Sequence, residues 1–427
     1  PPPPAAAGPS PATWWEEVAK PAIIAFCKRF SLAAAGNRFQ LRRFTARALE
    51  LALEANDWPQ VAACRERLHS FEMAAAAGVA VRTHVPLVEN EIPDIFHLAA
   101  EGRHGPSPGL RSVRDAGGAV LSSREEVEAE ITGYFTALFH GRHVASVDGH
   151  PVDSGATFQP DEALYPRFLE ALPSLDPDQR ASLERPFMLH ELEAAVLGAE
   201  ASKSPGLDGL SYEFYKATFP LVGPPLLEAF NDMLAEGLLP ASMRKGVVRL
   251  LPKVAGIPSA SQLRPITLLN TDYKLLTKIL VARLLPVLPS VLRSTQLCSV
   301  QGRSIFDGPA AILSAVEYLQ RHSKPGFLFS LDFFHAYDRV SLHWVDKVME
   351  AMGFGAIFRG WVATLHRETS SAFLLHDISS FISIIFSIKQ GDPFAVLLFI
   401  INIEPFLVRL EASLHGLQMA NLREASF

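Results

Sequence analysis

Two stretches near the amino terminus repeat apolar residues every three or four positions. They are residues 43–56 (RFTARALELALEAN) and residues 59–77 (PQVAACRERLHSFEMAAAA). This spacing predicts two amphipathic helices, and the Asn-Asp-Trp-Pro sequence at residues 56–59 predicts the turn of a helical hairpin between them. The Pro- and Ala-rich residues 1–20 are expected to form an extended or disordered tail.

The next patterned segment is residues 116–139 (AGGAVLSSREEVEAEITGYFTALF). It predicts a turn and a strand, followed by a helix capped by Ser122 or Ser123. Residues 141–185 are rich in Pro, Gly and Asp, which predicts a flexible linker.

A cluster of apolar residues at 326–333 (GFLFSLDF) predicts a short buried strand. Asp332 lies at its end, and the aromatic Tyr337 follows five positions later. A carboxylate at a strand end can bind Mg²⁺, and two such ions about 3.5–4 Å apart can hold the attacking and leaving oxygens of a phosphoryl transfer. The alternative for Asp332 alone is a helix cap.

Residues 389–407 (KQGDPFAVLLFIINIEPFL) place a Gln-Gly-Asp-Pro turn directly before an apolar helix. Backbone N–H groups at the start of such a helix face outward, which suits binding of a base or a phosphate.

Three further blocks precede these two: KSPGLDGLSYEFYK at residues 203–216, LLPK ending at Lys253, and LRPITLLNTDYKLLTKILVARLLPVLP from Leu263. In this order and at these separations, the blocks resemble the reverse transcriptases of non-LTR (LINE-type) retrotransposons. The resemblance covers about residues 185–416, with a weaker likeness from about residue 37.

The resemblance implies an α/β right-hand polymerase fold. It assigns residues 21–140 to a helical leader, residues 186–320 to the fingers and residues 321–427 to part of the palm. The implied activity is RNA-directed DNA synthesis with Mg²⁺ or Mn²⁺, deoxynucleoside triphosphates, a template RNA and a primer or target DNA. Neither a membrane nor a protein partner is expected.

Individual roles follow from the resemblance. Asp332 matches the aspartate that binds both metal ions, and the backbone carbonyl of Phe333 faces a metal. Tyr337 matches the aromatic residue that lies under the incoming sugar and excludes a 2′-hydroxyl. Gln390 and Gly391 match the pair beside the nucleotide and the template base.

The fingers contribute two cations by the same resemblance. Lys253 and Arg264 match residues that hold the triphosphate, a task suited to one point charge and one bidentate fork. An element near the template and fingers comprises Lys203, Pro205, Gly206, Asp208 and Gly209. Without the resemblance, the two cations would be read as solvated surface charges and the glycine-rich element as an ordinary turn.

The family's next element, an aromatic-Ala-Asp-Asp hairpin that supplies the second metal-binding carboxylate, is not among the 427 residues. A two-metal site with one carboxylate strand is expected to be inactive or very slow. One alternative is therefore a non-catalytic nucleic-acid-binding remnant of such an element. Another is a group II intron-type maturase, which LLNTDYKLLTKILVARL argues against.

Composition changes this picture only locally. The net charge of −6 argues against strong nucleic-acid binding by the chain as a whole. Residues 241–303, however, contain ten Lys or Arg and one acid, Asp272. Such a basic run predicts salt-dependent phosphate binding, with a solvated helical face as the alternative. The ten residues are Arg244, Lys245, Arg249, Lys253, Arg264, Lys274, Lys278, Arg283, Arg293 and Arg303.

Cys27, Cys64 and Cys298 are too few and too scattered for a disulfide framework or a zinc ribbon, which favours a reducing, intracellular compartment. No signal peptide is visible. The apolar run at residues 394–403 is much shorter than the roughly 20 residues that span a bilayer.

Overall fold

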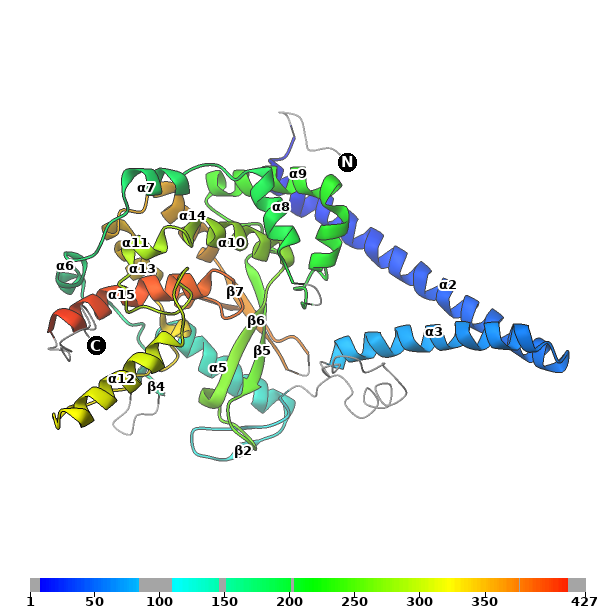
Figure 1. Cartoon of the computed structure of the whole chain (residues 1–427), viewed down its shortest axis with the longest axis horizontal. Helices are drawn as coiled ribbons and strands as arrows, with labels where there is room; N and C mark the ends of the chain where they lie inside the picture. Colours follow the sequence, from blue (N-terminus) through cyan, green and yellow to red (C-terminus); the bar gives the residue numbers. More distant parts are fainter. Residues whose placement is uncertain (1–7, 84–109, 146–150, 201–202, 376, 414–427) are drawn as a thin grey trace. The chain divides into compact units, whose positions relative to one another are not determined.

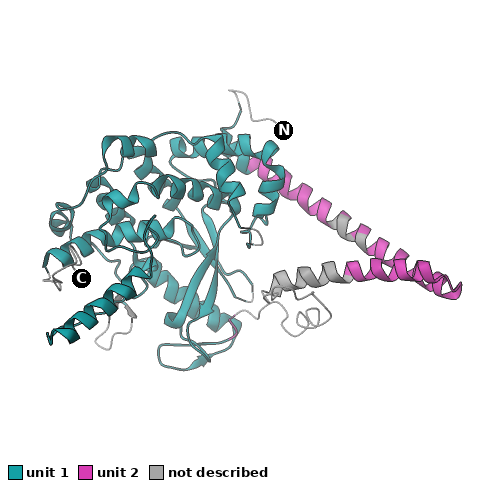
Figure 2. Ribbon diagram, viewed as in Figure 1, with its two compact units in different colours: residues 1–16, 112–427 teal, residues 17–111 magenta. Residues whose placement is uncertain are grey.

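The computed structural model describes residues 8–83, 110–145, 151–200, 203–375 and 377–413. The chain divides into two compact units, shown in Figure 2. One unit is Glu17–Arg111, and the other combines Pro1–Glu16 with Ser112–Phe427.

The unit Glu17–Arg111 contains the helical hairpin that the sequence predicts. Helix α2 (Lys20–Glu54) and helix α3 (Trp58–Thr83) are joined by a turn in which Asn56 has a φ of +55°. The two helices pack through small and apolar side chains that include the buried Ala52 and Val61. The hairpin prediction is confirmed, although α2 begins well before the predicted start. The prediction missed the amino-terminal half of α2 because this half lacks a regular apolar repeat.

The predicted amino-terminal tail is wrong from residue 8 onward, whereas residues 1–7 lie outside the described part. Helix α1 (Pro11–Trp14) begins at Ser10, whose hydroxyl accepts the Thr13 N–H, and a π-helical turn (Trp15–Ala19) follows. The buried Trp15 indole donates to the Asp272 carboxylate at 3.2 Å. A cap and one deeply buried ring thus order a segment whose composition suggests disorder.

The larger unit is built around a four-stranded sheet in the order β6-β5-β7-β8 (Figure 1). Strands β5 (Lys245–Pro252) and β6 (Leu263–Leu268) are an antiparallel pair. Strand β7 (Ser370–Leu374) pairs with β5 in parallel, and β8 (Ile382–Ser383) closes the other edge. The mixture of this sheet with packed helices confirms the predicted α/β class.

Helix α5 (Arg124–Phe139) follows the short pair β1 (Val113–Arg114) and β2 (Val120–Leu121). Ser123 and Glu126 form the capping box that the sequence predicts. The buried Phe135 ring lies 5.1 Å from that of Phe373 in β7, so α5 is packed against the sheet.

Other helices enclose the core of this unit, where Phe230, Phe358 and Phe394 are fully buried. The longer ones are α8 (Leu189–Leu197), α9 (Tyr212–Glu236), α10 (Thr271–Leu284), α12 (Asp307–Arg321), α13 (Leu342–Ala351), α14 (Ala356–His366) and α15 (Ala395–Ser413). None of the described helices combines the length and apolar character needed to cross a membrane.

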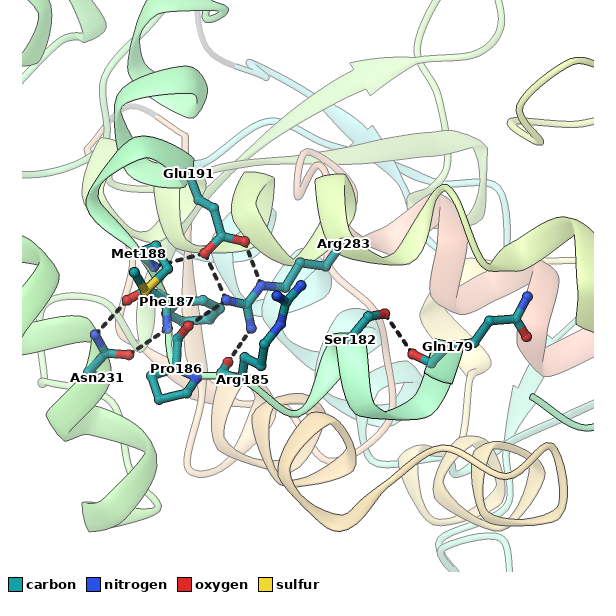
Figure 3. Close-up of polar contacts among 9 residues, drawn as sticks. All are labelled: Gln179, Ser182, Arg185, Pro186, Phe187, Met188, Glu191, Asn231 and Arg283. Atoms are coloured by element: carbon teal, nitrogen blue, oxygen red, sulfur yellow. Dashed lines mark hydrogen bonds and ion pairs between the residues drawn. The ribbon is translucent and has the colours of Figure 1, made fainter. Parts of the chain in front are cut away.

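Arg283 of α10 forms hydrogen bonds to α8 and to the segment that leads into it (Figure 3). Its guanidinium donates to both carboxylate oxygens of Glu191 at 2.7 Å and to the carbonyl of Pro186. It also lies 4.7 Å from the centre of the Phe187 ring. Arg283 is therefore a structural residue of the fold.

Residues 141–185, predicted as a linker, contain several short elements, and the prediction of unstructured chain is wrong for these. Capping carboxylates at Asp161 and Asp176 start two of the helical segments. The elements are β3 (His143–Ala145), β4 (Pro151–Asp153), a 3₁₀ turn (Glu162–Leu164), α6 (Tyr165–Leu169) and α7 (Pro177–Leu183). Elsewhere in the unit lie the 3₁₀ turns Ala260–Gln262 and Tyr337–Arg339, together with α11 (Leu288–Val291).

The buried strand predicted at residues 326–333 is wrong. This segment forms neither helix nor strand, and Phe327 and Phe329 are 91% and 81% exposed. The edges of the described four-stranded sheet are β6 and β8, and neither pairs with it. An apolar sequence becomes a buried strand only where a neighbouring strand pairs its N–H and C=O groups and a second layer covers its side chains.

Candidate active site

The Gln-Gly-Asp-Pro turn is tied to two distant parts of the chain. The carbonyl of Gln390 accepts the N–H of Thr267 in β6 at 2.7 Å. Two residues earlier, the N–H of Ile388 donates to the carbonyl of Tyr337 at 3.0 Å. These two backbone hydrogen bonds bring together strand β6, the turn and the residue predicted to lie under the sugar.

Gly391 is required by the geometry of this turn. Its φ is +113°, a backbone region that side chains disfavour. A Cβ atom at this position would lie 2.4 Å from the Thr267 carbonyl oxygen. The absence of a side chain therefore lets the turn approach β6 closely.

The Tyr337 ring is held in place by α15. It stacks on Phe399 with the ring centres 5.0 Å apart and the planes 19° apart. Phe333 contacts the same Phe399 edge-on at 6.2 Å. Partial burial raises the pKa of Tyr337.

Asp332 is placed less firmly than Tyr337. Its side chain is exposed, and its link to the rest of the site is its neighbour Phe333. The contacts thus join Tyr337 to the turn that carries Gln390, while convergence of Asp332 on the same cleft stays a prediction.

The Gln390 side chain is connected to a buried polar chain that sequence reasoning missed. Its Nε2 donates to Asp338 Oδ2 at 3.4 Å, and the same oxygen lies 3.1 Å from His335 Nδ1. His335 Nε2 lies 3.0 Å from the hydroxyl of Tyr134 in α5, and burial raises the pKa of this phenol. Asp338 and His335 are both buried, so they can fix the direction of the Gln390 amide.

A second buried group, Lys389, lies directly before Gln390 and was also missed. Its Nζ has no hydrogen-bond partner among the described residues and lies 5.2 Å from the centre of the Tyr273 ring. Burial lowers the pKa of Lys389 to about 8. Burial also raises the pKa of Asp392, which accepts a hydrogen bond from the Tyr273 hydroxyl at 2.8 Å.

His366, at the end of α14, is also buried. Its Nδ1 lies 2.8 Å from the Val362 carbonyl, whereas Nε2 has no partner among the described residues. Burial is the main cause that lowers the pKa of His366 to about 4, and the Lys389 charge acts in the same direction.

The two predicted triphosphate ligands lie on the β5–β6 pair. Arg264 is directly opposite Leu251 in the antiparallel register, and the Lys253 N–H continues the pairing to the Gln262 carbonyl. Because side chains alternate along a strand, Arg249 and Lys253 project from the same face as Arg264. Arg249 is thus a third cation that register, rather than motif, places on this face.

The glycine-rich element packs on the beginning of α10. A Cβ atom on Gly206 would lie 2.2 Å from the Asn270 side-chain oxygen, and Gly209 has a φ of +73°. Asp208 accepts the N–H of Leu210, which stabilises the turn. The remaining predicted members are the half-buried Pro205 and Lys203, which is exposed and pairs with Glu200.

The basic run at residues 241–303 is not one continuous surface. Arg244 pairs with Glu368, and Arg283 with Glu191. Arg293 pairs with Glu404, while Arg303 donates to backbone carbonyls that include Gln296. The interpretation of all ten cations as one phosphate-binding stripe is therefore wrong, because the fold itself uses these four.

Metal binding receives little support from side-chain grouping. Within the described ranges, no cluster of three or more His, Cys, Asp or Glu side chains could hold a metal ion. Asp332 contributes one exposed carboxylate, so these residues do not by themselves fit a two-ion site.

Comparisons with known proteins agree with the order of the sequence blocks. Residues 251–420 match the family model of reverse transcriptase (RNA-dependent DNA polymerase). The chain is also 28% identical over 413 residues to a protein of Xenopus laevis described as "Transposon TX1 uncharacterized 149 kDa protein". The matched region is 95% of this chain but 30% of that relative. The predicted resemblance to a non-LTR retrotransposon reverse transcriptase is confirmed.

Proposed function

We propose that this chain, which carries the reverse transcriptase domain of a non-LTR retrotransposon, forms the nucleotide-binding part of an RNA-directed DNA polymerase. The observation that carries this proposal is the hydrogen bond from Thr267 to the Gln390 carbonyl. It joins the strand that bears Arg264 to the turn that bears Gln390 and Gly391. The residues proposed to bind the triphosphate and those proposed to face the base then lie on one wall of the site, formed by strand β6 and the turn.

The proposed arrangement places a deoxynucleoside triphosphate along this wall. Lys253 and Arg264 hold its phosphates, and Arg249 on the same face adds a third positive charge. The sugar lies over Tyr337, whose ring cannot retreat because it stacks on Phe399. A fixed ring leaves room for hydrogen but not for a 2′-hydroxyl.

The base and the template lie beside the turn. Gln390 presents an amide whose direction is set by Asp338, and Gly391 leaves backbone exposed beside it. The element from Lys203 to Gly209 lies against the start of α10 and is proposed to contact the template RNA. A primer or target DNA is the other proposed partner.

Divalent metal ions are the general requirement of this polymerase family. We propose Mg²⁺, or Mn²⁺ in its place, with Asp332 and the Phe333 carbonyl as ligands. Because the described residues do not complete a two-ion site, no catalytic step is assigned to the metal.

Nucleotide binding by the whole chain tests this proposal. Affinity for a deoxynucleoside triphosphate is measured by equilibrium dialysis with an RNA template annealed to a DNA primer. Lys253→Ala combined with Arg264→Ala is expected to weaken binding about tenfold or more, because two charge-assisted contacts are lost. Tyr337→Ala is expected to reduce discrimination against the ribonucleotide. The control is Lys347→Ala, at a partly exposed lysine of α13 that pairs with Glu350.

Equal affinities of the double variant and the Lys347 control would contradict the proposal. The second candidate function, a non-catalytic nucleic-acid-binding remnant, is favoured by the exposed position of Asp332. That candidate predicts that the template and primer bind. It also predicts that replacing Lys253, Arg264 or Tyr337 leaves the affinity for nucleotide unchanged.

A further inference from the structure

We propose that helix α2, in the unit Glu17–Arg111, is a binding surface for single-stranded nucleic acid. The residues concerned lie outside the candidate active site and do not depend on it. The proposal rests on the charge of α2, on its exposed aromatic rings and on the spacing between the two.

The charge of α2 differs from that of the rest of the chain. Residues 20–49 contain seven Lys or Arg and no Asp or Glu, in a protein whose net charge is −6. Cations on an exposed helix attract the phosphates of a nucleic acid and release its counterions. The seven are Lys20, which is buried and takes no part in the proposed surface, together with Lys28, Arg29, Arg38, Arg42, Arg43 and Arg47.

The same helix exposes large aromatic side chains. Phe26, Phe39 and Phe44 are between 60% and 74% exposed, and Phe30, 65% exposed, stacks on Phe26. Phenylalanine normally contributes its large apolar area to a core. At about 100° per residue, Phe26, Phe30 and Phe44 share one face of α2, whereas Phe39 lies about 140° away from it. An exposed helix face that carries three such rings indicates a surface that another molecule covers.

In α2, three of the phenylalanines are each followed by an arginine three positions later. A Phe-x-x-Arg sequence occurs three times, at residues 26–29, 39–42 and 44–47. Residues three apart are neighbours on a helix surface, so each ring has a guanidinium beside it. Arg43 also lies 5.8 Å from the centre of the Phe39 ring. Stacking of bases on rings beside phosphate-binding cations is how proteins hold single strands without sequence preference.

Among the arginines of α2 whose side chains the structure describes, Arg47 has a strong competitor. Arg47 pairs with Glu50 at 2.6 Å, but both side chains are more than half exposed. Exposed pairs of this kind contribute little energy and can exchange partners. A phosphate can therefore replace Glu50 as the partner of Arg47.

Charge also decides against a second copy of this helix as the covering molecule. Two α2 helices would bring cation against cation over residues 20–49, which contain no acidic side chain. A single strand is preferred to a duplex because exposed rings need the faces of bases, and a duplex hides these faces in its own stack. Phe26 and Phe44 are about 27 Å apart along the helix axis, which suits several successive nucleotides.

The test is fluorescence anisotropy of the whole chain with a labelled 20-nucleotide RNA of mixed sequence. Phe26→Ala, Phe30→Ala and Phe44→Ala are combined in one variant, which is expected to raise Kd about tenfold or more. The control removes apolar side chains that are equally exposed in the other unit, by Phe158→Ala with Leu221→Ala. The control is expected to stay within about twofold of the starting protein.

A charge variant provides the second measurement. Arg29→Gln with Arg47→Gln is expected to lower the slope of log K against log salt by about 1.4, since each phosphate contact contributes about 0.7 for a single strand. Arg65→Gln with Arg67→Gln on α3, which flank Glu66, is the matched control. Circular dichroism checks helix content, and Phe→Leu at the three ring positions removes the rings while keeping apolar bulk.

Three results would overturn the proposal. The first is unchanged RNA affinity in both the Ala and the Leu ring variants. The second is equal affinity for duplex and single strand that only the charge variant reduces, which would leave phosphate attraction without stacking. The third is self-association that the ring variant abolishes with no effect on RNA binding. Lys253→Ala with Arg264→Ala tests the polymerase site separately through nucleotide affinity.

Discussion

Strand β5 and residues 326–333 are both short apolar runs, yet they reach opposite states. Val247 and Val248 of β5 are buried, and β5 pairs with β6 on one side and β7 on the other. Phe327 and Phe329 are almost fully exposed, and no described strand pairs with them. The residue types are equally suited to a strand, so the neighbours decide which run becomes one.

The same difference separates the two halves of the candidate site. Arg264 and Gln390 lie on the fixed side, where backbone hydrogen bonds join β6 to the Gln-Gly turn. Asp332 lies at the end of the unpaired run, and its neighbour Phe333 is its described link to α15. The residues proposed to recognise the nucleotide are therefore more firmly organised than those proposed to bind metal.

The largest expected difference in the free energy of unfolding is between two variants that each lose one phenylalanine ring. One ring lies in the sheet and the other in residues 326–333. Phe373→Ala in β7 is expected to lower the free energy of unfolding by about 3–5 kcal/mol, because the ring is fully buried. Phe329→Ala is expected to change it by about 0.5 kcal/mol or less. Urea denaturation of the two variants measures both values. Similar losses would show that residues 326–333 are buried in solution and would remove the contrast.

Acid sensitivity is expected to come from the fixed region through His366. Its pKa is lowered to about 4 by burial, so in the unfolded chain it takes up a proton first as the pH falls. Stability is present above the unfolded pKa of about 6.5 and is lost between about pH 6.5 and 4, by about 3 kcal/mol. His366→Leu is expected to flatten the unfolding free energy over this interval.

The control for His366 is the exposed His190, in the variant His190→Leu. Denaturation curves at half-unit pH steps measure both variants and the starting protein. A slope that persists unchanged in His366→Leu would assign the acid sensitivity to other groups.

Two aspartates give a smaller and more local contrast. Asp338→Asn is expected to cost about 2 kcal/mol, because Asp338 is buried between His335 and the Gln390 amide. Asp332→Asn is expected to leave stability unchanged, since the side chain is exposed. Thermal denaturation distinguishes the two. Equal costs would mean that Asp332 has acquired a buried partner.

The same Asp332→Asn variant tests catalysis. We expect no template-dependent primer extension by this chain in Mg²⁺ or Mn²⁺, and hence no further loss in the variant, because the described residues offer one carboxylate at this site and one carboxylate cannot hold two close divalent ions. Extension that Asp332→Asn abolishes would show that another carboxylate completes the site.

An element of the fold could be predicted from the sequence where residues close to it in the chain determine its structure. The helical hairpin and the Ser123 cap depend on residues within a few positions, and both predictions are confirmed. The cap that starts α1 is equally local, but the Pro-rich composition concealed it. The strand before Asp332 depended on a distant neighbour, and its prediction was wrong.

The site shows the same division. The turn pattern and the family resemblance together predicted Gln390 and Gly391 as site residues, and the close approach of the Thr267 carbonyl explains why position 391 is glycine. The chain from Tyr134 through His335 to Asp338 joins residues about two hundred positions apart, and no local pattern signals such a partner. Arg249 could have been found from alternation along β5 once the register with β6 was known.

The smallest expected change in stability concerns the exposed run itself. Phe327→Ser with Phe329→Ser is expected to leave the unfolding free energy unchanged within about 0.5 kcal/mol, because neither ring is packed. Association should nevertheless fall markedly. An apolar run with unpaired backbone groups can pair with the same run of another molecule, and polar side chains at alternate positions weaken such pairing.

Light scattering at several protein concentrations measures this association, and Phe158→Ser with Leu221→Ser is the control for general loss of exposed apolar surface. A lower scattering in the Phe327 and Phe329 variant alone would assign the association to residues 326–333. Equal scattering by the starting protein and both double variants would mean that residues 326–333 do not mediate association. The difference between this run and β5 would then lie in its own backbone preferences rather than in the lack of a neighbour.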